Sequence, residues 1–308
     1  MSNHEIIQVS NLEKRYQSFH AVKGISFSVK RGELFAFLGT NGAGKSTTID
    51  ILCTLTKKSS GSVIIDGHQL GVENDAIRKK IGVVFQDGLL DERLTVYENI
   101  VNRGHYYQLT KKEIEENYHF VSKYLKLEDI QHKKYGSLSG GQKRRSDIAR
   151  AIFHRPNILF LDEPTTGLDP QTRVFVWNAM KQLQQDTNMT IFLTTHYMEE
   201  AAVADHVVVI KEGKMIAEGT PNQLKEQFAY DSLHLEFKHS FNPEVYFNSK
   251  RLAFTKQNSI YQVRLNSTLE AFDFLKDLEG NVVSFEVIKG SMDDVFIHIN
   301  EAEGRLVQ

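Results

Sequence analysis

Nine residues, GTNGAGKST at Gly39–Thr47, constrain the fold of this chain more than any other segment. They follow five apolar residues, Leu34–Leu38, which have the length and composition of a strand covered on both faces. A helix is expected to follow, from about Lys45 to Thr54. Glycines between a strand and a helix let the backbone N–H groups point inward, where they bind phosphate oxygens. The segment therefore predicts an α/β fold in which a strand, a phosphate-binding loop and a helix follow one another directly.

The polar residues of this loop suit the phosphates of a nucleotide. Lys45 is expected to reach the β- and γ-phosphates, Ser46 to bind Mg²⁺, and Thr47 to add a further phosphate contact. The N-terminus of the following helix adds its partial positive charge. The alternative is a glycine-rich turn that arises by chance, which leaves the flanking strand and helix without explanation. The predicted nucleotide contacts are Gly39, Asn41, Gly42, Ala43, Gly44, Lys45, Ser46 and Thr47.

Two adjacent carboxylates follow a second apolar strand. Asp162 and Glu163 come directly after Ile158–Leu161, and ligands of α/β sheets bind beyond the carboxyl ends of the strands. Adjacent residues on a strand point in different directions, so the two carboxylates can have separate roles. Asp162 is expected to hold Mg²⁺ through water, and Glu163 to polarise the attacking water. The alternative is a helix N-cap, in which Asp162 or Thr165 caps the next segment.

A third motif, LSGGQ at Leu138–Gln142, has five specified residues. Ser139 is a natural N-cap, and Gly140 and Gly141 leave the end of the helix open, so the hydroxyl and the amides suit a γ-phosphate. The following KRR run, Lys143–Arg145, is expected on a solvated helix face or at an interface. Because the net charge is only −2, no overall basic field indicates nucleic acid, and no nucleic-acid partner is expected.

In this order the motifs resemble those of the ATP-binding cassette (ABC) ATPases, over about residues 5–225. The resemblance implies that Ser139, Gly140, Gly141 and Gln142 close over the ATP held by a second cassette, in a head-to-tail dimer. Such an interface is self-complementary, as two-fold interfaces are. On this resemblance the expected partner is an identical chain.

The same resemblance implies roles for four further residues. It implies that Tyr16 stacks on adenine and that Gln86 contacts Mg²⁺ or the attacking water. Asp169, in Gly167-Leu168-Asp169, resembles the residue that links the two active sites, and His196 resembles the histidine that contacts the γ-phosphate. Two alternatives stay open, because Tyr16 also suits a core or edge position and a lone histidine is often structural.

The finer pattern resembles one subfamily of these ATPases. The segments QDGLLDERLTVYENI, GLDPQTR, TTHYMEEA and SMDDVFIHI are similar to those of drug-resistance ATP-binding subunits related to daunorubicin exporters. Those subunits work with separate membrane subunits of the ABC-2 type. The resemblance implies an ATP-hydrolysing subunit that uses ATP and Mg²⁺, powers export, and binds integral membrane permease subunits at the cytoplasmic face of the cell membrane. No apolar run approaches the roughly 18–20 residues of a spanning helix.

The chain is expected to form two domains. Residues 1–227 are predicted to form a P-loop NTPase nucleotide-binding domain of the ABC type, with a mixed sheet core, an antiparallel β subdomain and a helical subdomain. Residues 95–127 are expected to be helical within it. Residues 228–308 are predicted to form a small α+β domain, because apolar residues alternate as in strands there. Between two of these strands, Leu269, Phe272, Leu275 and Leu278 recur at helical spacing.

Two other functions stay open. The first is a soluble ABC ATPase acting on a non-membrane partner, such as the ribosome or DNA. Such proteins usually carry two cassettes in one chain or long coiled-coil insertions, whereas this sequence has one cassette and no heptad run. The second is a nucleotide-sensing module without turnover, against which the presence of Glu163 and His196 argues.

Overall fold

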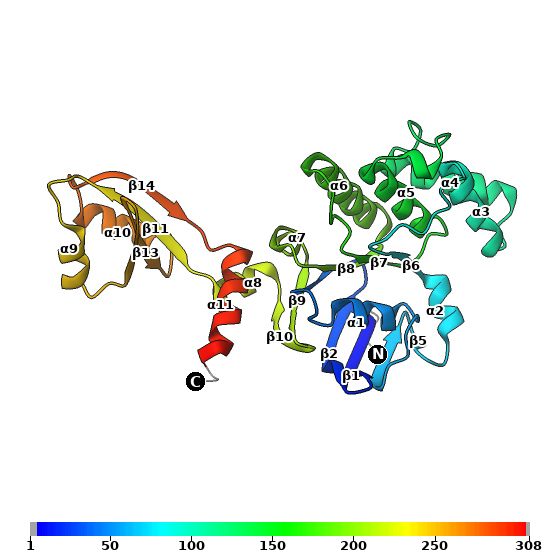
Figure 1. The fold of residues 1–308 in the computed structure, drawn as a ribbon, viewed down its shortest axis with the longest axis horizontal. Helices are drawn as coiled ribbons and strands as arrows, with labels where there is room; N and C mark the ends of the chain where they lie inside the picture. The colour runs from blue at the N-terminus through cyan, green and yellow to red at the C-terminus, as the bar shows by residue number, and fades with distance from the viewer. Residues whose placement is uncertain (1–4, 306–308) are drawn as a thin grey trace. The chain divides into compact units, whose positions relative to one another are not determined.

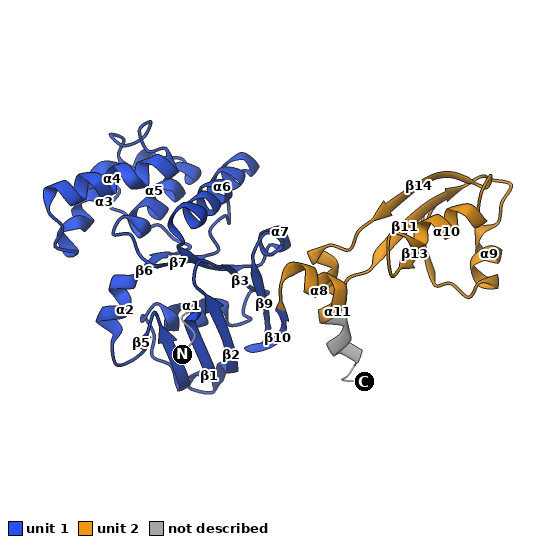
Figure 2. Ribbon diagram, turned by 180° about the vertical axis from the view of Figure 1, so that it is seen from behind, with its two compact units in different colours: residues 1–218 blue, residues 219–308 orange. Residues whose placement is uncertain are grey.

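The computed structural model describes residues 5–305 (Figure 1). The chain divides into two compact units, Met1–Glu218 and Gly219–Gln308 (Figure 2). This division precedes helix α8 (Pro221–Phe228), whereas the sequence analysis placed the boundary after residue 227. Helix α8 packs against α11 (Met292–Arg305), and His298 hydrogen-bonds the carbonyl oxygen of Phe228 at 2.8 Å. These contacts group α8 with the second unit.

A six-stranded sheet forms the centre of the first unit, in the order β10-β9-β3-β8-β7-β6. Five of its strands pair in parallel, which confirms the predicted sheet. Strand β10 instead returns from β9 through Glu212 and Gly213, whose φ angles of 49° and 80° are typical of a tight hairpin. The strands are β3 (Leu34–Leu38), β6 (Ile81–Val84), β7 (Ile158–Asp162), β8 (Thr190–Thr195), β9 (His206–Lys211) and β10 (Lys214–Gly219).

A second, antiparallel sheet has the order β2-β1-β4-β5. Strands β1 and β2 of this sheet have 12 residues each. Helix α1 (Lys45–Leu52) contacts both β2 and strands β7 and β8 of the first sheet, so the helix that follows the phosphate loop is held between the two sheets. The strands are β1 (Glu5–Tyr16), β2 (Phe19–Lys30), β4 (Ser60–Ile65) and β5 (His68–Gln69).

The helical region expected over residues 95–127 is two helices in the structure, α3 (Val96–Tyr106) and α4 (Lys111–Leu125). Each begins with its own capping box, Thr95 with Glu98 and Thr110 with Glu113. The repeated T-x-x-E pattern is the signal that marked the break. The other helices of this unit are α2 (Asn74–Lys80), α5 (Gly140–Ile152), α6 (Pro170–Thr187) and α7 (Met198–Ala202). Among residues 5–305, no helix combines the length and the apolar content needed to cross a membrane.

Besides α8 and α11, the second unit contains a four-stranded antiparallel sheet with two helices packed on one face. The helical spacing noted in the sequence is confirmed by a helix over Glu270–Asp277, in which Leu269 before its first residue and Phe272 are 69% and 71% exposed. The residues that α10 directs into the core are Ala271, Phe274 and Leu275, and Leu278 follows at its end. The elements are β11 (Asp231–Phe237), α9 (Pro243–Ser249), β12 (Phe254–Gln257), β13 (Ile260–Leu265), α10 (Glu270–Asp277) and β14 (Val282–Ile288).

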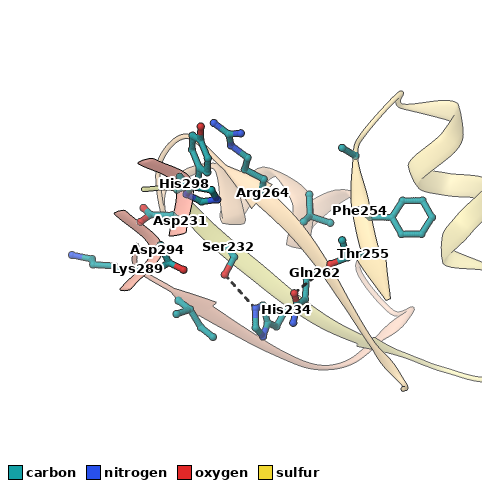
Figure 3. Close-up of a pocket in the computed structure, with 14 residues that line it drawn as sticks. Asp231, Ser232, His234, Phe254, Thr255, Gln262, Arg264, Lys289, Asp294 and His298 are labelled. Carbon is teal, nitrogen blue, oxygen red and sulfur yellow. Dashed lines mark hydrogen bonds between the residues drawn. The ribbon is translucent and has the colours of Figure 1, made fainter. Parts of the chain in front are cut away.

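The other face of this sheet is polar and forms an open cavity of about 480 Å³ (Figure 3). Ser232 and His234 of β11 line it and hydrogen-bond each other at 3.2 Å, while Leu233 between them is buried on the helix-covered face. Gln262 and Arg264 of β13 lie beside them. The alternation along both strands therefore separates an apolar face from a polar one.

We expect the core between the two sheets of the first unit to be sensitive to a cavity at Phe192. Its ring is fully buried and lies 5.1 Å from Phe35 and 5.4 Å from Phe160, between ring centroids. The change Phe192→Ala should lower the free energy of unfolding by about 3–5 kcal/mol. The measurement is urea unfolding of the full chain, followed by the fluorescence of its single tryptophan, Trp177 in the first unit.

The matched control is Val174→Ala, because Val174 is 59% exposed on α6. That change should alter the free energy of unfolding by no more than about 0.5 kcal/mol. Equal urea midpoints for the two variants would contradict the assignment of Phe192 to the core.

Candidate active site

The phosphate loop lies where β3 ends and α1 begins, as predicted. Gly44 is the N-cap of α1 with φ 105°, and a Cβ there would lie 2.7 Å from the carbonyl oxygen of Ala21, so only glycine fits. Helix α1 has no side-chain cap, which leaves its first N–H groups free to bind an anion. Ala43 is buried, whereas Asn41, Gly42 and Ser46 are exposed at the loop surface.

Lys45 places a positive charge beneath this loop. It is 3% exposed, and its Nζ donates to the carbonyl oxygens of Gly39 at 2.9 Å and Thr40 at 3.2 Å. Glu163 Oε1 lies 3.4 Å from the same Nζ. Burial lowers the pKa of Lys45, and the charge of Glu163 partly offsets this. A buried ammonium with one carboxylate neighbour is suited to an anionic ligand.

The two carboxylates predicted from the sequence face different partners. Asp162 Oδ1 accepts from Thr194 Oγ1 at 2.5 Å, on the neighbouring strand β8. Burial raises the pKa of Asp162, and the hydrogen bond from Thr194 opposes that shift. Glu163 has φ 45°, so the backbone turns sharply after Asp162 and directs the next carboxylate toward Lys45.

His196 lies beside Glu163, just after β8. Its Nδ1 is 3.2 Å from Glu163 Oε1, although the two groups are not aligned for a hydrogen bond. Lys45 and His196 therefore approach the same carboxylate oxygen. Residues from β3, β7 and β8 thus meet at the carboxyl edge of the sheet, which the sequence order alone left undetermined.

A cavity of about 340 Å³ opens above these groups. Gln86, which follows β6, lines it together with Glu163. Phe19 also lines it and was missed, whereas Tyr16 does not line it. The two aromatic residues pair across the β1–β2 hairpin, and Lys14 Nζ lies 4.5 Å from the Tyr16 ring centroid. An aromatic residue at each end of this two-residue turn is a signal that could have identified Phe19. The other lining residues are Ala21, Asn41, Gly42, Gly44, Lys45, Ser46 and Thr47.

The signature residues do not line this cavity. Ser139 caps α5, and its hydroxyl accepts from the Gln142 N–H at 3.4 Å while Gln142 Oε1 accepts from the Ser139 N–H at 3.1 Å. Ser139, Gly141 and Gln142 line a separate hollow of about 260 Å³, and Ser139 and Gly140 are exposed. Within one chain, the structure does not bring the signature and the phosphate loop together.

Asp169 is connected to the signature through Thr172. It caps α6 and accepts from the N–H of Thr172 at 2.9 Å and from its Oγ1 at 2.6 Å, and these bonds lower the pKa of Asp169. A Cβ on Gly141 would lie 2.6 Å from Thr172 Cγ2, so a larger residue would separate α5 from α6. The start of α6 and the signature therefore form one surface.

Two family models match the chain. A model described as "ABC transporter" matches residues 22–166, and one described as "ATP-binding protein DrrA1-3-like, C-terminal domain" matches residues 219–299. The linearmycin resistance ATP-binding protein LnrL of Bacillus subtilis is 34% identical over 305 residues, which cover 96% of this chain and 98% of the relative. The daunorubicin/doxorubicin resistance ATP-binding protein DrrA of Streptomyces peucetius is 40% identical, over 74% of this chain and 69% of the relative. The Nod factor export ATP-binding protein I of Burkholderia lata is 41% identical, over 71% and 72%.

Solved structures resemble the first unit. The protein cbiO1 of Clostridium perfringens, part of the ABC transporter complex cbiONQ, matches with a TM-score of 0.68 and 33% identity, over 72% of this chain and 91% of that chain. A dimeric post-hydrolysis state of the ATP-binding cassette MJ0796, bound to ADP and Pi, matches with a TM-score of 0.64 and 29% identity, over 70% and 98%.

The raised pKa of Asp162 predicts that Asp162→Asn stabilises the ligand-free chain at neutral pH. The pKa is higher in the folded than in the unfolded state, so the ionised carboxylate destabilises the fold, and this cost disappears as the pH falls through the interval between the two values. The thermal midpoint of the variant should exceed that of the wild type at about pH 7, and the difference should shrink toward about pH 4. A difference that grows as the pH falls would contradict this assignment.

Proposed function

The chain belongs to the ATP-binding proteins of ABC transporters, and we propose that it hydrolyses ATP to power export through separate membrane-spanning subunits. ATP binding and hydrolysis are the activities of its family. The observation that carries the proposal is the position of Glu163, whose Oε1 lies beside both Lys45 and His196 at the edge of the phosphate cavity. A carboxylate there can accept a proton from a water that attacks a bound γ-phosphate.

The names of the relatives support export as the direction of transport. Two relatives are named for resistance to linearmycin and to daunorubicin or doxorubicin, and the third is named for Nod factor export. The relative named for linearmycin resistance covers nearly the whole chain, including the second unit. We therefore place the chain at the cytoplasmic face of the cell membrane, bound to permease subunits of the ABC-2 type.

The oxygen ligands near the phosphate loop fit Mg²⁺. Ser46, Gln86 and Glu163 line the same cavity, and Asp162 precedes Glu163 in the chain, so a hydroxyl, an amide and carboxylates lie near one another there. Such oxygen ligands suit Mg²⁺, which retains several waters and is shared with substrate phosphates. The ion would neutralise charge on the β- and γ-phosphates.

The protein's own groups account for positioning and charge. Lys45 and the N–H groups at the start of α1 hold the triphosphate, with the Lys45 ammonium transferring from Glu163 to the phosphate oxygens. That transfer frees Glu163 to orient the attacking water. His196 contacts the γ-phosphate from β8, and Gln86 contacts the water or the ion from β6. Phosphoryl transfer requires this placement more than covalent chemistry.

A second copy of the chain supplies the missing signature. Ser139 is exposed and lines a hollow separate from the phosphate cavity, and Gly140 beside it is exposed, so these residues cannot serve the nucleotide of their own chain without a large rearrangement. A head-to-tail dimer brings each signature over the partner's phosphate loop, with Asp169 between the two sites. The dimeric cassette among the structural relatives supports this arrangement.

The change Glu163→Gln should leave ATP binding intact and slow hydrolysis by at least about 100-fold, because the acceptor for the water proton is lost. The variant should accumulate as an ATP-bound dimer, detectable by size-exclusion chromatography in the presence of ATP. Hydrolysis at the wild-type rate would contradict the role assigned to Glu163.

The change Ser139→Arg should abolish hydrolysis while the monomer binds a fluorescent ATP analogue almost normally. The exposed signature serves the partner's nucleotide, so an arginine there obstructs only the closed dimer. The control is Lys45→Met, which should weaken binding itself. If Ser139→Arg and Lys45→Met reduced binding equally, the composite site would be wrong.

A further inference from the structure

Arg144 is buried, whereas its place in the KRR run predicted a solvated helix face or an interface. It is 6% exposed, whereas Arg145 beside it pairs with Asp129 at 3.0 Å near the surface. Burial lowers the pKa of Arg144, and the charge of Asp147 one turn later offsets this most. A guanidinium buried in this way requires specific acceptors.

Those acceptors are two successive carbonyls at the end of β6. Arg144 Nη1 donates to the carbonyl oxygen of Phe85 at 2.8 Å, and its Nη2 donates to that of Gln86 at 3.3 Å. The Gln86 side chain lines the phosphate cavity. One side chain of α5 therefore holds the backbone from which Gln86 reaches the nucleotide site.

Neighbouring groups restrict the same loop further along. Asp147 is 6% exposed, and both of its carboxylate oxygens accept from the Tyr135 hydroxyl at 3.1 Å. A Cβ on Gly88 would lie 2.1 Å from that hydroxyl oxygen, so residue 88 must be glycine for the loop to pass. The segment after β6 is thus held at two points by residues 135–147.

We propose that Arg144 is a positioning residue that fixes Gln86 in the phosphate cavity. The inference rests on the proposed function, and it adds a mechanical link within the chain. Arg144 lies on the helix whose first residues form the signature, so the loop that serves this chain's nucleotide and the signature that serves the partner's are held by one helix. Arginine is required because two carbonyls on successive residues need two donors from one planar group.

The test is a double-mutant cycle in the full-length chain between Arg144→Met and Gln86→Ala. Each single change should lower kcat for ATP hydrolysis on the order of 10-fold and raise the Mg²⁺ concentration for half-maximal rate, because a displaced contact group loses its effect. Affinity for a fluorescent ATP analogue should change less than about twofold, since the phosphate loop is intact. The double variant should match Gln86→Ala within about twofold, because Arg144 acts through Gln86.

Arg150→Met is the matched control. Arg150 also lies on α5 and donates to the carbonyl oxygen of Val83 at 2.6 Å, on the same strand but before the loop. The fold-reduction in kcat caused by Arg150→Met should multiply with that caused by Gln86→Ala, as expected for two independent effects. Should Arg144→Met not fold, Arg144→Lys keeps the charge near Asp147 and can hold one carbonyl, so it should fold and lie between wild type and Gln86→Ala in Mg²⁺ dependence.

The inference is overturned if the effects of Arg144→Met, or of Arg144→Lys, multiply with that of Gln86→Ala. It is also overturned if Gln86→Ala leaves kcat and Mg²⁺ dependence unchanged, because no effect could then pass through Gln86. Failure of the proposed function looks different. It would appear as absent hydrolysis in the wild-type chain or as full hydrolysis by Glu163→Gln, whichever way the Arg144 cycle falls.

Discussion

The buried charge of Lys45 is the constraint on which the rest of the site depends. An ammonium that is 3% exposed needs acceptors, and the ligand-free chain supplies two loop carbonyls and Glu163. The loop can hold Lys45 there because α1 is packed between two sheets. The proposed exchange of Glu163 for phosphate joins nucleotide binding to the release of the catalytic carboxylate. The affinity for the nucleotide and the availability of Glu163 for catalysis then both depend on the ion pair between Lys45 and Glu163.

The rest of the site is held by close contacts of helix α5 with helix α6 and with the loop of Gln86. Thr172 of α6 fills the space left by Gly141, which joins the Asp169 region to the signature. Arg144 joins the same helix, α5, to the loop of Gln86. Helix α5 therefore contacts both the loop of Gln86 and the start of α6, where Asp169 lies. A small displacement of α5 would move all three segments together, because packed elements shift as bodies and do not deform gradually.

Much of the fold could be predicted because each motif requires a particular element before or after it in the chain. An apolar strand before the loop and a second one before Asp162 determine where the sheet edge lies, and the structure follows both. The failures have local causes. The break between α3 and α4 was overlooked because its capping residues were read as part of one helix. The spacing of Leu269 and Phe272 predicted a helix, but spacing alone does not identify the covered face, and both residues are exposed in the structure.

The sequence by itself determined the chemistry: a phosphate loop, two carboxylates after a strand, and a signature whose string is specific to one family. Such groups are recognisable because their spacing along the chain is dictated by backbone geometry. The tertiary structure alone decided which groups meet. It placed Lys45 and His196 on one oxygen of Glu163, kept the signature apart from that cavity, and buried Arg144 against Gln86. These contacts join segments far apart in sequence, and only the packing of sheets and helices brings such segments together.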